Sequence, residues 1–114
     1  MSRRSDHDWL ADVLAEATLL ASAIDTVSIA QFRDDPILQR AVQHKLQTIG
    51  EAAGKTSDET LAAIPDVPWP QVRGMRNRIV HGYFGIDPKT IWRTAVEEVP
   101  ALAKAVRAYL DRNA

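Results

Sequence analysis

Helical periodicity is the feature that most constrains how this chain can fold. Apolar residues recur at three- and four-residue spacing, whereas the alternation typical of a β-strand is nearly absent. These stripes predict main helices over residues 8–24, 36–54 and 88–112. Amphipathic helices joined by short loops bury their apolar faces against one another. The sequence therefore predicts an all-α fold, an up-down helical bundle that forms a single domain over residues 1–114.

Capping residues predict where these helices begin and end. Ser5 or Asp6 can cap the first helix, and Asp35 followed by Pro36 suits the start of the second main helix. Gly54 suits the end of that helix, because glycine is common just past a helix C-terminus.

Shorter helices are expected between the main ones. The residues after Ser28 form either a short helix or a loop. Thr56 and Glu59 have capping-box spacing, which predicts a brief helix through Ala63.

Prolines mark the remaining boundaries. Residues 64–70 contain three prolines and are predicted to form a connecting loop. Pro70 can open another main helix that should stop near Gly82, which makes four main helices in all. Pro100 interrupts the last apolar stripe, and its missing N–H predicts a kink there.

Composition excludes several classes of function. The chain has no cysteine, which excludes disulfides, cysteine zinc sites and thiol catalysis. Its formal net charge of −1 gives no general affinity for nucleic acid, so any such binding must depend on a local patch. No apolar run approaches the roughly 20 residues of a membrane span, and a cytoplasmic protein without a membrane partner is expected.

Residues 69–81 form such a local patch, with three arginines and no acidic residue. Its polar side chains are Arg73, Arg76, Asn77, Arg78 and His81. With about 100° between successive residues of a helix, Arg73, Asn77 and His81 lie in one row. Arg76 flanks this row and Arg78 points away from it. The guanidinium fork matches phosphate oxygens, which predicts a small anion site with Arg73 and Arg78 as RNA- or phosphate-binding residues.

These residue types are the ones needed to cleave RNA without a metal. One group removes the 2′-OH proton, the 2′ oxygen attacks phosphorus, and a cation stabilises the charge that develops. No metal-ligand set or cofactor motif is evident. Solvated arginines with a structural histidine, or binding of carbohydrate or protein, would explain the same residues, so the residues alone leave these alternatives open.

The spacing from Arg76 to Tyr83 reads R-N-x-x-x-H-x-Y and resembles the signature of the HepT-like toxins of the HEPN superfamily. The stretches "IGEAAGK" (49–55), "IPDVPWPQVRGMRNRIVHGYFGID" (64–87) and "IWRTAVEEVPAL" (91–102) also resemble that family. The resemblance covers roughly residues 8–112. An arginine and a histidine at this spacing occur by chance, but their placement after a Pro-Trp loop and before Gly-Tyr makes the match specific.

The resemblance implies a dimeric, metal-independent endoribonuclease with no cofactor. Arg76 and His81 would be the catalytic pair and Asn77 the accessory polar residue of the motif. In the family, two copies of the motif face each other across the dimer cleft. The usual partner is an MntA-type minimal nucleotidyltransferase, the antitoxin of a type VII toxin–antitoxin system, which would join the homodimer in a larger hetero-oligomer.

The resemblance also implies how such a toxin is neutralised. The antitoxin transfers AMP from ATP to the motif tyrosine, here Tyr83. Each AMP adds bulk and negative charge beside a site that attracts phosphate. Two alternatives are open: a non-catalytic nucleotide- or protein-binding subunit of the nucleotidyltransferase, and a structural helical adaptor.

Overall fold

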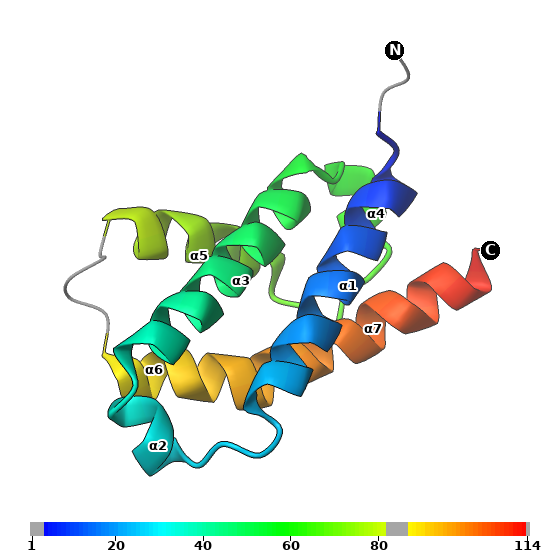
Figure 1. Ribbon diagram of the computed structural model, residues 1–114. Helices are drawn as coiled ribbons and strands as arrows, with labels where there is room; N and C mark the ends of the chain where they lie inside the picture. Colours follow the sequence, from blue (N-terminus) through cyan, green and yellow to red (C-terminus); the bar gives the residue numbers. More distant parts are fainter. Residues whose placement is uncertain (1–3, 82–86, 114) are drawn as a thin grey trace.

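The computed structural model describes residues 4–81 and 87–113, except for the side chains of residues 79–81 (Figure 1). Within these ranges every regular element is helical, which confirms the predicted all-α fold. In chain order the elements are α1 (Asp6–Ile24), α2 (Ile29–Arg33), α3 (Pro36–Lys55), α4 (Asp58–Ala62), α5 (Trp69–His81), α6 (Pro88–Arg93), the π-helix η1 (Thr94–Glu98) and α7 (Val99–Arg112).

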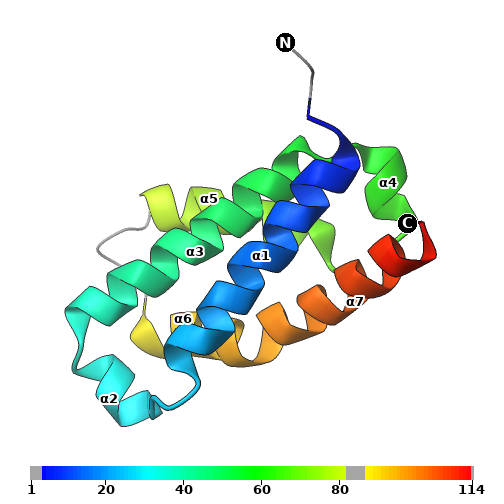
Figure 2. The same ribbon diagram turned by 45° about the vertical axis from the view of Figure 1, so that its right-hand side comes forward.

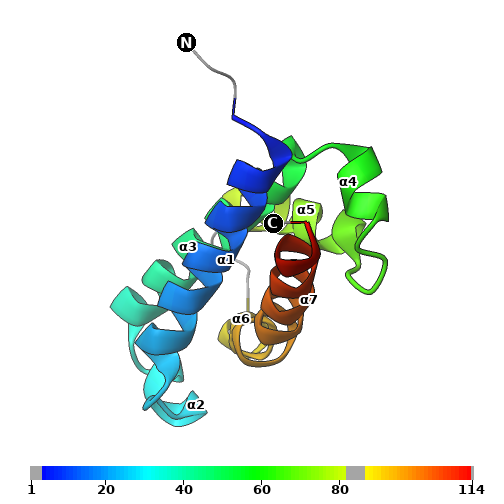
Figure 3. The same ribbon diagram turned by 90° about the vertical axis from the view of Figure 1, so that its right-hand side faces the viewer.

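The main helices form an up-down bundle, as the sequence predicted. Helices α1 and α3 lie side by side and antiparallel, and α5 crosses α3 while α7 packs against α1 (Figures 1 and 2). Turned by 90°, the molecule shows α1 and α3 on one side and the α6–η1–α7 run on the other (Figure 3). Helix α5 therefore packs chiefly against α3, and this contact positions the polar row of the motif.

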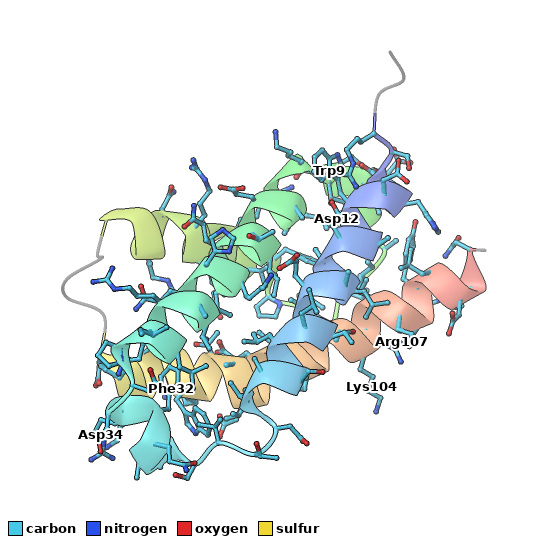
Figure 4. The ribbon with its side chains drawn as sticks, in the orientation of Figure 1. Trp9, Asp12, Phe32, Asp34, Lys104 and Arg107 are labelled. Atoms are coloured by element: carbon cyan, nitrogen blue, oxygen red, sulfur yellow. The ribbon has the colours of Figure 1, made fainter. Side chains whose placement is uncertain are left out.

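A continuous apolar core fills the space between these helices. Its largest fully buried side chains are Phe32, Leu10, Leu20, Ile49, Val13, Val42 and Val106. Phe32 joins the short helix α2 to α6, because its ring centroid lies 5.2 Å from that of Trp92 (Figure 4). Trp9 and Trp92 are half-buried and pack against the core, whereas Lys104 and Arg107 on α7 are exposed (Figure 4).

The helix starts follow the predicted capping pattern. Ser5 caps α1, and its hydroxyl accepts from the Asp8 backbone N–H at 3.1 Å. Ser28 caps α2 with Gln31 as its capping-box partner, so this ambiguous segment is a helix. Asp35 caps α3 with the proline after it in the first turn. These local hydrogen bonds satisfy backbone N–H groups that have no partner within the helix.

The end of α3 differs slightly from the prediction. The helix continues one residue past Gly54 and ends at Lys55, and no described glycine has a positive φ. The following residue, Thr56, is extended and buried, and its hydroxyl donates to the Ala52 carbonyl oxygen at 3.0 Å. The helix is therefore terminated by the extended, buried Thr56 and not by a glycine in the left-handed conformation.

The predicted capping box of α4 is wrong by one residue. Ser57, not Thr56, caps this helix, and its hydroxyl accepts from the Thr60 backbone N–H at 3.3 Å. Asp6 at the start of α1 accepts hydrogen bonds from both Ser57 and Thr60. The side-chain hydrogen bond from Ser57 is the main reason that the pKa of Asp6 is lowered. These hydrogen bonds join the start of α1 to the start of α4 across about half the chain.

The predicted last helix is divided into three parts. Instead of one continuous α-helix, α6 passes into the π-helix η1 and then into α7. The kink at Pro100 stays a prediction. The backbone N–H of Val99 donates to the Thr94 carbonyl oxygen, a five-residue step typical of a π-helix. Pro100 lies in the first turn of α7, directly after the π-helix, so its missing N–H falls at the junction of the two. The proline is accommodated by a wider turn before it.

Gly50 lies at a close approach between α3 and α5. A Cβ placed on this buried glycine would lie 3.1 Å from both the Arg76 amide nitrogen and the Val72 carbonyl oxygen. Both atoms are backbone, so they give way only if the whole of α5 shifts. A residue without a side chain is what permits the two helices to approach this closely.

Gly50→Ala is expected to lower the free energy of unfolding by about 1–3 kcal/mol, because the added methyl overpacks the contact between the helices. Gly54→Ala is the matched control on the same helix, since a Cβ there meets nothing within 4 Å. It should raise the free energy of unfolding by about 0.4–1 kcal/mol. Urea titrations followed by circular dichroism measure both, and equal effects of the two substitutions would contradict the assigned contact.

Candidate functional site

The start of α5 is held by Trp69. This side chain is only 6% exposed, and its indole N–H donates to the Ile64 carbonyl oxygen at 3.0 Å. The indole therefore packs the start of α5 into the core, and the buried ring is closed to base stacking. From this anchored end, α5 carries the polar motif along the surface of α3.

Arg76 is held at one edge by a carboxylate of α3. Its Nε donates to Glu51 Oε1 at 3.0 Å, and the two side chains are 50% and 42% exposed. The hydrogen bond from Arg76, followed by one from Gln47, lowers the pKa of Glu51. The guanidinium is thus an oriented cation at the surface and not a freely rotating one.

Arg73 ties α5 to the end of α3. Its guanidinium donates to the Thr56 carbonyl oxygen at 3.0 Å and to the Ala53 carbonyl oxygen at 3.4 Å, and it pairs with Asp58 at 2.9 Å. Carbonyls at a helix C-terminus lack partners within the helix and attract cations. Two of the three arginines in residues 69–81, Arg73 and Arg76, are therefore paired with carboxylates. A phosphate bound at Arg73 would compete with Asp58.

Asn77 and Arg78 are exposed, and neither makes a side-chain hydrogen bond within the described part of the chain. Asn77 follows Arg76 directly on α5. Arg78 lies about 100° further around the helix and lines a separate pocket. The roles of Arg73 and Arg78 in RNA or phosphate binding remain predictions.

This pocket has a volume of about 290 Å³ and lies between α5 and the α6–η1–α7 run. Its apolar lining includes Val72 and Met75 of α5 and Leu102 of α7. Arg93 and Glu97 contribute charges of both signs. The pocket is on the opposite side of α5 from Asn77, so it is separate from the predicted row formed by Arg73, Asn77 and His81.

His81 is the last residue of α5, and only its backbone lies within the described structure. It is five residues beyond Arg76, which corresponds to about 7.5 Å along the helix axis and about 140° around it. Tyr83 lies outside the described residues, so the predicted modification site stays a prediction.

Sequence reasoning missed three residues that position this site: Gly50, Glu51 and Asp58. Gly50 sets the spacing between α3 and α5, while the two acids pair with Arg76 and Arg73. A signal for the close helix approach was present, because Gly50 and Ala53 are small residues one turn apart. No comparable signal marked the acidic partners, which lie far from the arginines in sequence.

Two other site classes receive no support in the described ranges. No cluster of three or more His, Asp or Glu side chains there could hold a metal ion, and His44 is an exposed residue of α3. None of the helices within those ranges is both long and apolar enough to cross a membrane.

The sequence model of a family described as "Ribonuclease HepT-like" matches residues 13–109 of this chain. The chain belongs to the HepT-like ribonuclease family. The match includes all of α3 and α5, and therefore the contact that positions the motif.

Curated relatives of the family cover nearly the whole chain. A "Putative RNase" of Caldanaerobacter subterraneus subsp. tengcongensis is 33% identical over 110 residues, which is 96% of this chain and 98% of that protein. The "Probable ribonuclease HepT" of Thermococcus cleftensis is 31% identical over 100 residues, 88% and 91% of the two chains. A "Putative RNase" of Methanocaldococcus jannaschii is 32% identical over 106 residues, 93% and 97%. No solved structure gave a significant match to the chain.

Proposed function

We propose that this protein is a metal-independent endoribonuclease and the toxin of a type VII toxin–antitoxin system. The observation that carries the proposal is the Arg76–His81 spacing on α5, with the half-exposed Arg76 side chain held at Nε by Glu51. Membership of the HepT-like ribonuclease family and the ribonuclease names of its relatives support the reaction class.

The proposed reaction uses the substrate's own 2′ oxygen as the nucleophile. His81 accepts the 2′-OH proton, and the 2′ oxygen forms a bond to the neighbouring phosphorus. Arg76 stabilises the negative charge that develops on the non-bridging oxygens, and Asn77 orients the imidazole or a sugar hydroxyl. The bond from phosphorus to the 5′ oxygen breaks, and that oxygen takes up a proton. The products are a 2′,3′-cyclic phosphate and a 5′-hydroxyl end.

A homodimer is part of the proposal, because Arg76 and His81 are spread about 140° around one helix. A facing second copy would bring the arginine of one protomer and the histidine of the other to the same phosphate. The active site would then lie in the cleft between the two protomers, where a bulky group attached beside it can block RNA.

Control by a partner completes the proposed function. A nucleotidyltransferase of the MntA type would transfer AMP from ATP to the Tyr83 hydroxyl and release pyrophosphate. The added phosphate is negatively charged and bulky, so it repels and blocks RNA at an arginine-containing cleft. The alternative is a non-catalytic nucleotide- or protein-binding subunit of the same partner. RNA cleavage by the purified protein separates the two functions.

Cleavage is expected to persist in excess EDTA, since the nucleophile belongs to the RNA and needs no metal-bound water. The products should carry a 2′,3′-cyclic phosphate or its opened form, which mass spectrometry of a short labelled RNA distinguishes from other ends. The same RNA treated with a magnesium-dependent nuclease is the control for chelation. Strict dependence on added Mg²⁺, with 5′-phosphate products, would contradict the proposed chemistry.

A further inference from the structure

Among the residues that the structure describes, Arg76 is bound through Nε alone, which leaves the rest of its guanidinium group without a partner there. Its contact with Glu51 Oε1 is 3.0 Å long and joins α5 to α3 across 25 residues of sequence. The two terminal nitrogens of Arg76 have no hydrogen-bond partner within the described part of the structure. These nitrogens form the fork that binds two phosphate oxygens at once. The contact therefore sets the direction of the fork without occupying it.

The backbone of Arg76 is positioned by the residue that precedes Glu51. A Cβ on Gly50 would lie 3.1 Å from the Arg76 amide nitrogen, so the two backbones meet at this point. Gln47, one turn earlier on α3, donates to the same Glu51 oxygen at 3.4 Å. One short segment of α3 thus positions both the main chain and the guanidinium of Arg76.

Stability does not explain this ion pair. Both side chains are about half exposed, and exposed ion pairs contribute about 0–1 kcal/mol to folding. The effect on the reaction rate can be much larger, because misplacement of a catalytic group by about 1 Å can cost roughly 100-fold in rate. Loss of the contact should therefore affect catalysis far more than folding.

We infer that Glu51 is a positioning residue: it holds Arg76 by Nε and directs the free end of the guanidinium toward the scissile phosphate. The inference rests on the proposed ribonuclease function. The role requires a hydrogen-bond acceptor at the correct distance from the α3 backbone, and it does not require a negative charge. The carboxylate of Glu51 touches neither the RNA nor the transferred proton.

Three substitutions separate reach from charge. Glu51→Gln keeps an oxygen acceptor at the same distance and removes the charge, so kcat should stay within about threefold of wild type. Glu51→Asp keeps the charge and shortens the side chain, and Glu51→Ala removes the acceptor. In both of these kcat should fall about 10–100-fold with KM within about threefold. Steady-state cleavage of a short RNA measures all four proteins.

Glu16→Ala is the control, because Glu16 forms another ion pair to α3, with Lys45 at 2.9 Å, although its side chain is only 21% exposed. This substitution should leave kcat unchanged. Equal loss of kcat in Glu51→Gln and Glu51→Ala would overturn the inference, as would a change confined to KM or wild-type activity in Glu51→Asp.

A second readout is independent of cleavage. The Arg76 Nε–Hε signal in NMR should be protected from solvent exchange in the wild-type protein and in Glu51→Gln, and unprotected in Glu51→Ala. Absence of cleavage in wild type would overturn the proposed function but leave the contact measurable. An unprotected signal in wild type would overturn the positioning role itself.

Discussion

Alanine in place of Arg76 or His81 is expected to reduce RNA cleavage by about 10²–10⁴-fold, because each variant loses a group that acts in the transition state. The effect should appear in kcat, with little change in helix content or oligomeric state. Arg76 is half exposed, and its ion pair with Glu51 contributes little to folding. Single-turnover cleavage of a short RNA, with circular dichroism and light scattering on the same samples, measures all three properties.

Matched controls are available at exposed positions away from α5. Arg107→Ala removes an exposed cation from α7, and His7→Ala removes an exposed histidine from the first turn of α1. Both variants should cleave RNA at the wild-type rate. If Arg76→Ala and His81→Ala also retained activity within a few-fold of wild type, the assignment of the catalytic pair would be refuted.

The second large effect concerns control of the toxin through Tyr83. Tyr83→Phe removes the hydroxyl that would accept AMP but keeps the ring, so the variant should fold and cleave RNA. It should gain no mass with ATP and the cognate nucleotidyltransferase, whereas wild type should gain about 329 Da for each AMP attached. Intact-mass spectrometry measures this directly. In cells, the variant should remain toxic when the nucleotidyltransferase is co-expressed.

Tyr109 provides the control for this test. It is a half-buried residue of α7, and Tyr109→Phe should still be modified to the same extent as wild type. Modification of Tyr83→Phe together with loss of modification in Tyr109→Phe would move the acceptor to Tyr109. Absence of modification in the wild-type protein would remove the proposed antitoxin mechanism and leave the ribonuclease proposal to be tested by cleavage.

Much of the fold could be predicted because helix formation depends on local signals. Apolar spacing marked α1 and α3, and a proline near its start and a glycine after its end marked α5. The capping hydrogen bonds of Ser5, Ser28 and Asp35 each reach only three residues along the chain. Where tertiary contacts intervened, the local rule failed. Thr56 was predicted to cap a helix, but burial turned its hydroxyl back to α3 and left capping to Ser57.

The candidate site divides in the same way. Arg73, Arg76 and Asn77 lie on one helix, so their spacing alone predicted the row of Arg73 and Asn77 with Arg76 beside it. Spacing could not predict that Arg73 and Arg76 pair with Asp58 and Glu51, because helical periodicity carries no information about contacts between helices. The local positive charge inferred from composition is therefore smaller in the folded protein.

By itself, the sequence determined an all-α bundle and placed an arginine–histidine motif on a helix that was predicted to begin at Pro70 and begins one residue earlier, at Trp69. Only the tertiary structure decided how that helix is presented. Gly50 brings α3 and α5 together at Arg76, and Glu51 then accepts a hydrogen bond from the arginine Nε. The physical reason is one of range: capping and periodicity act within a few residues, whereas the direction of the guanidinium depends on a carboxylate 25 residues away in sequence.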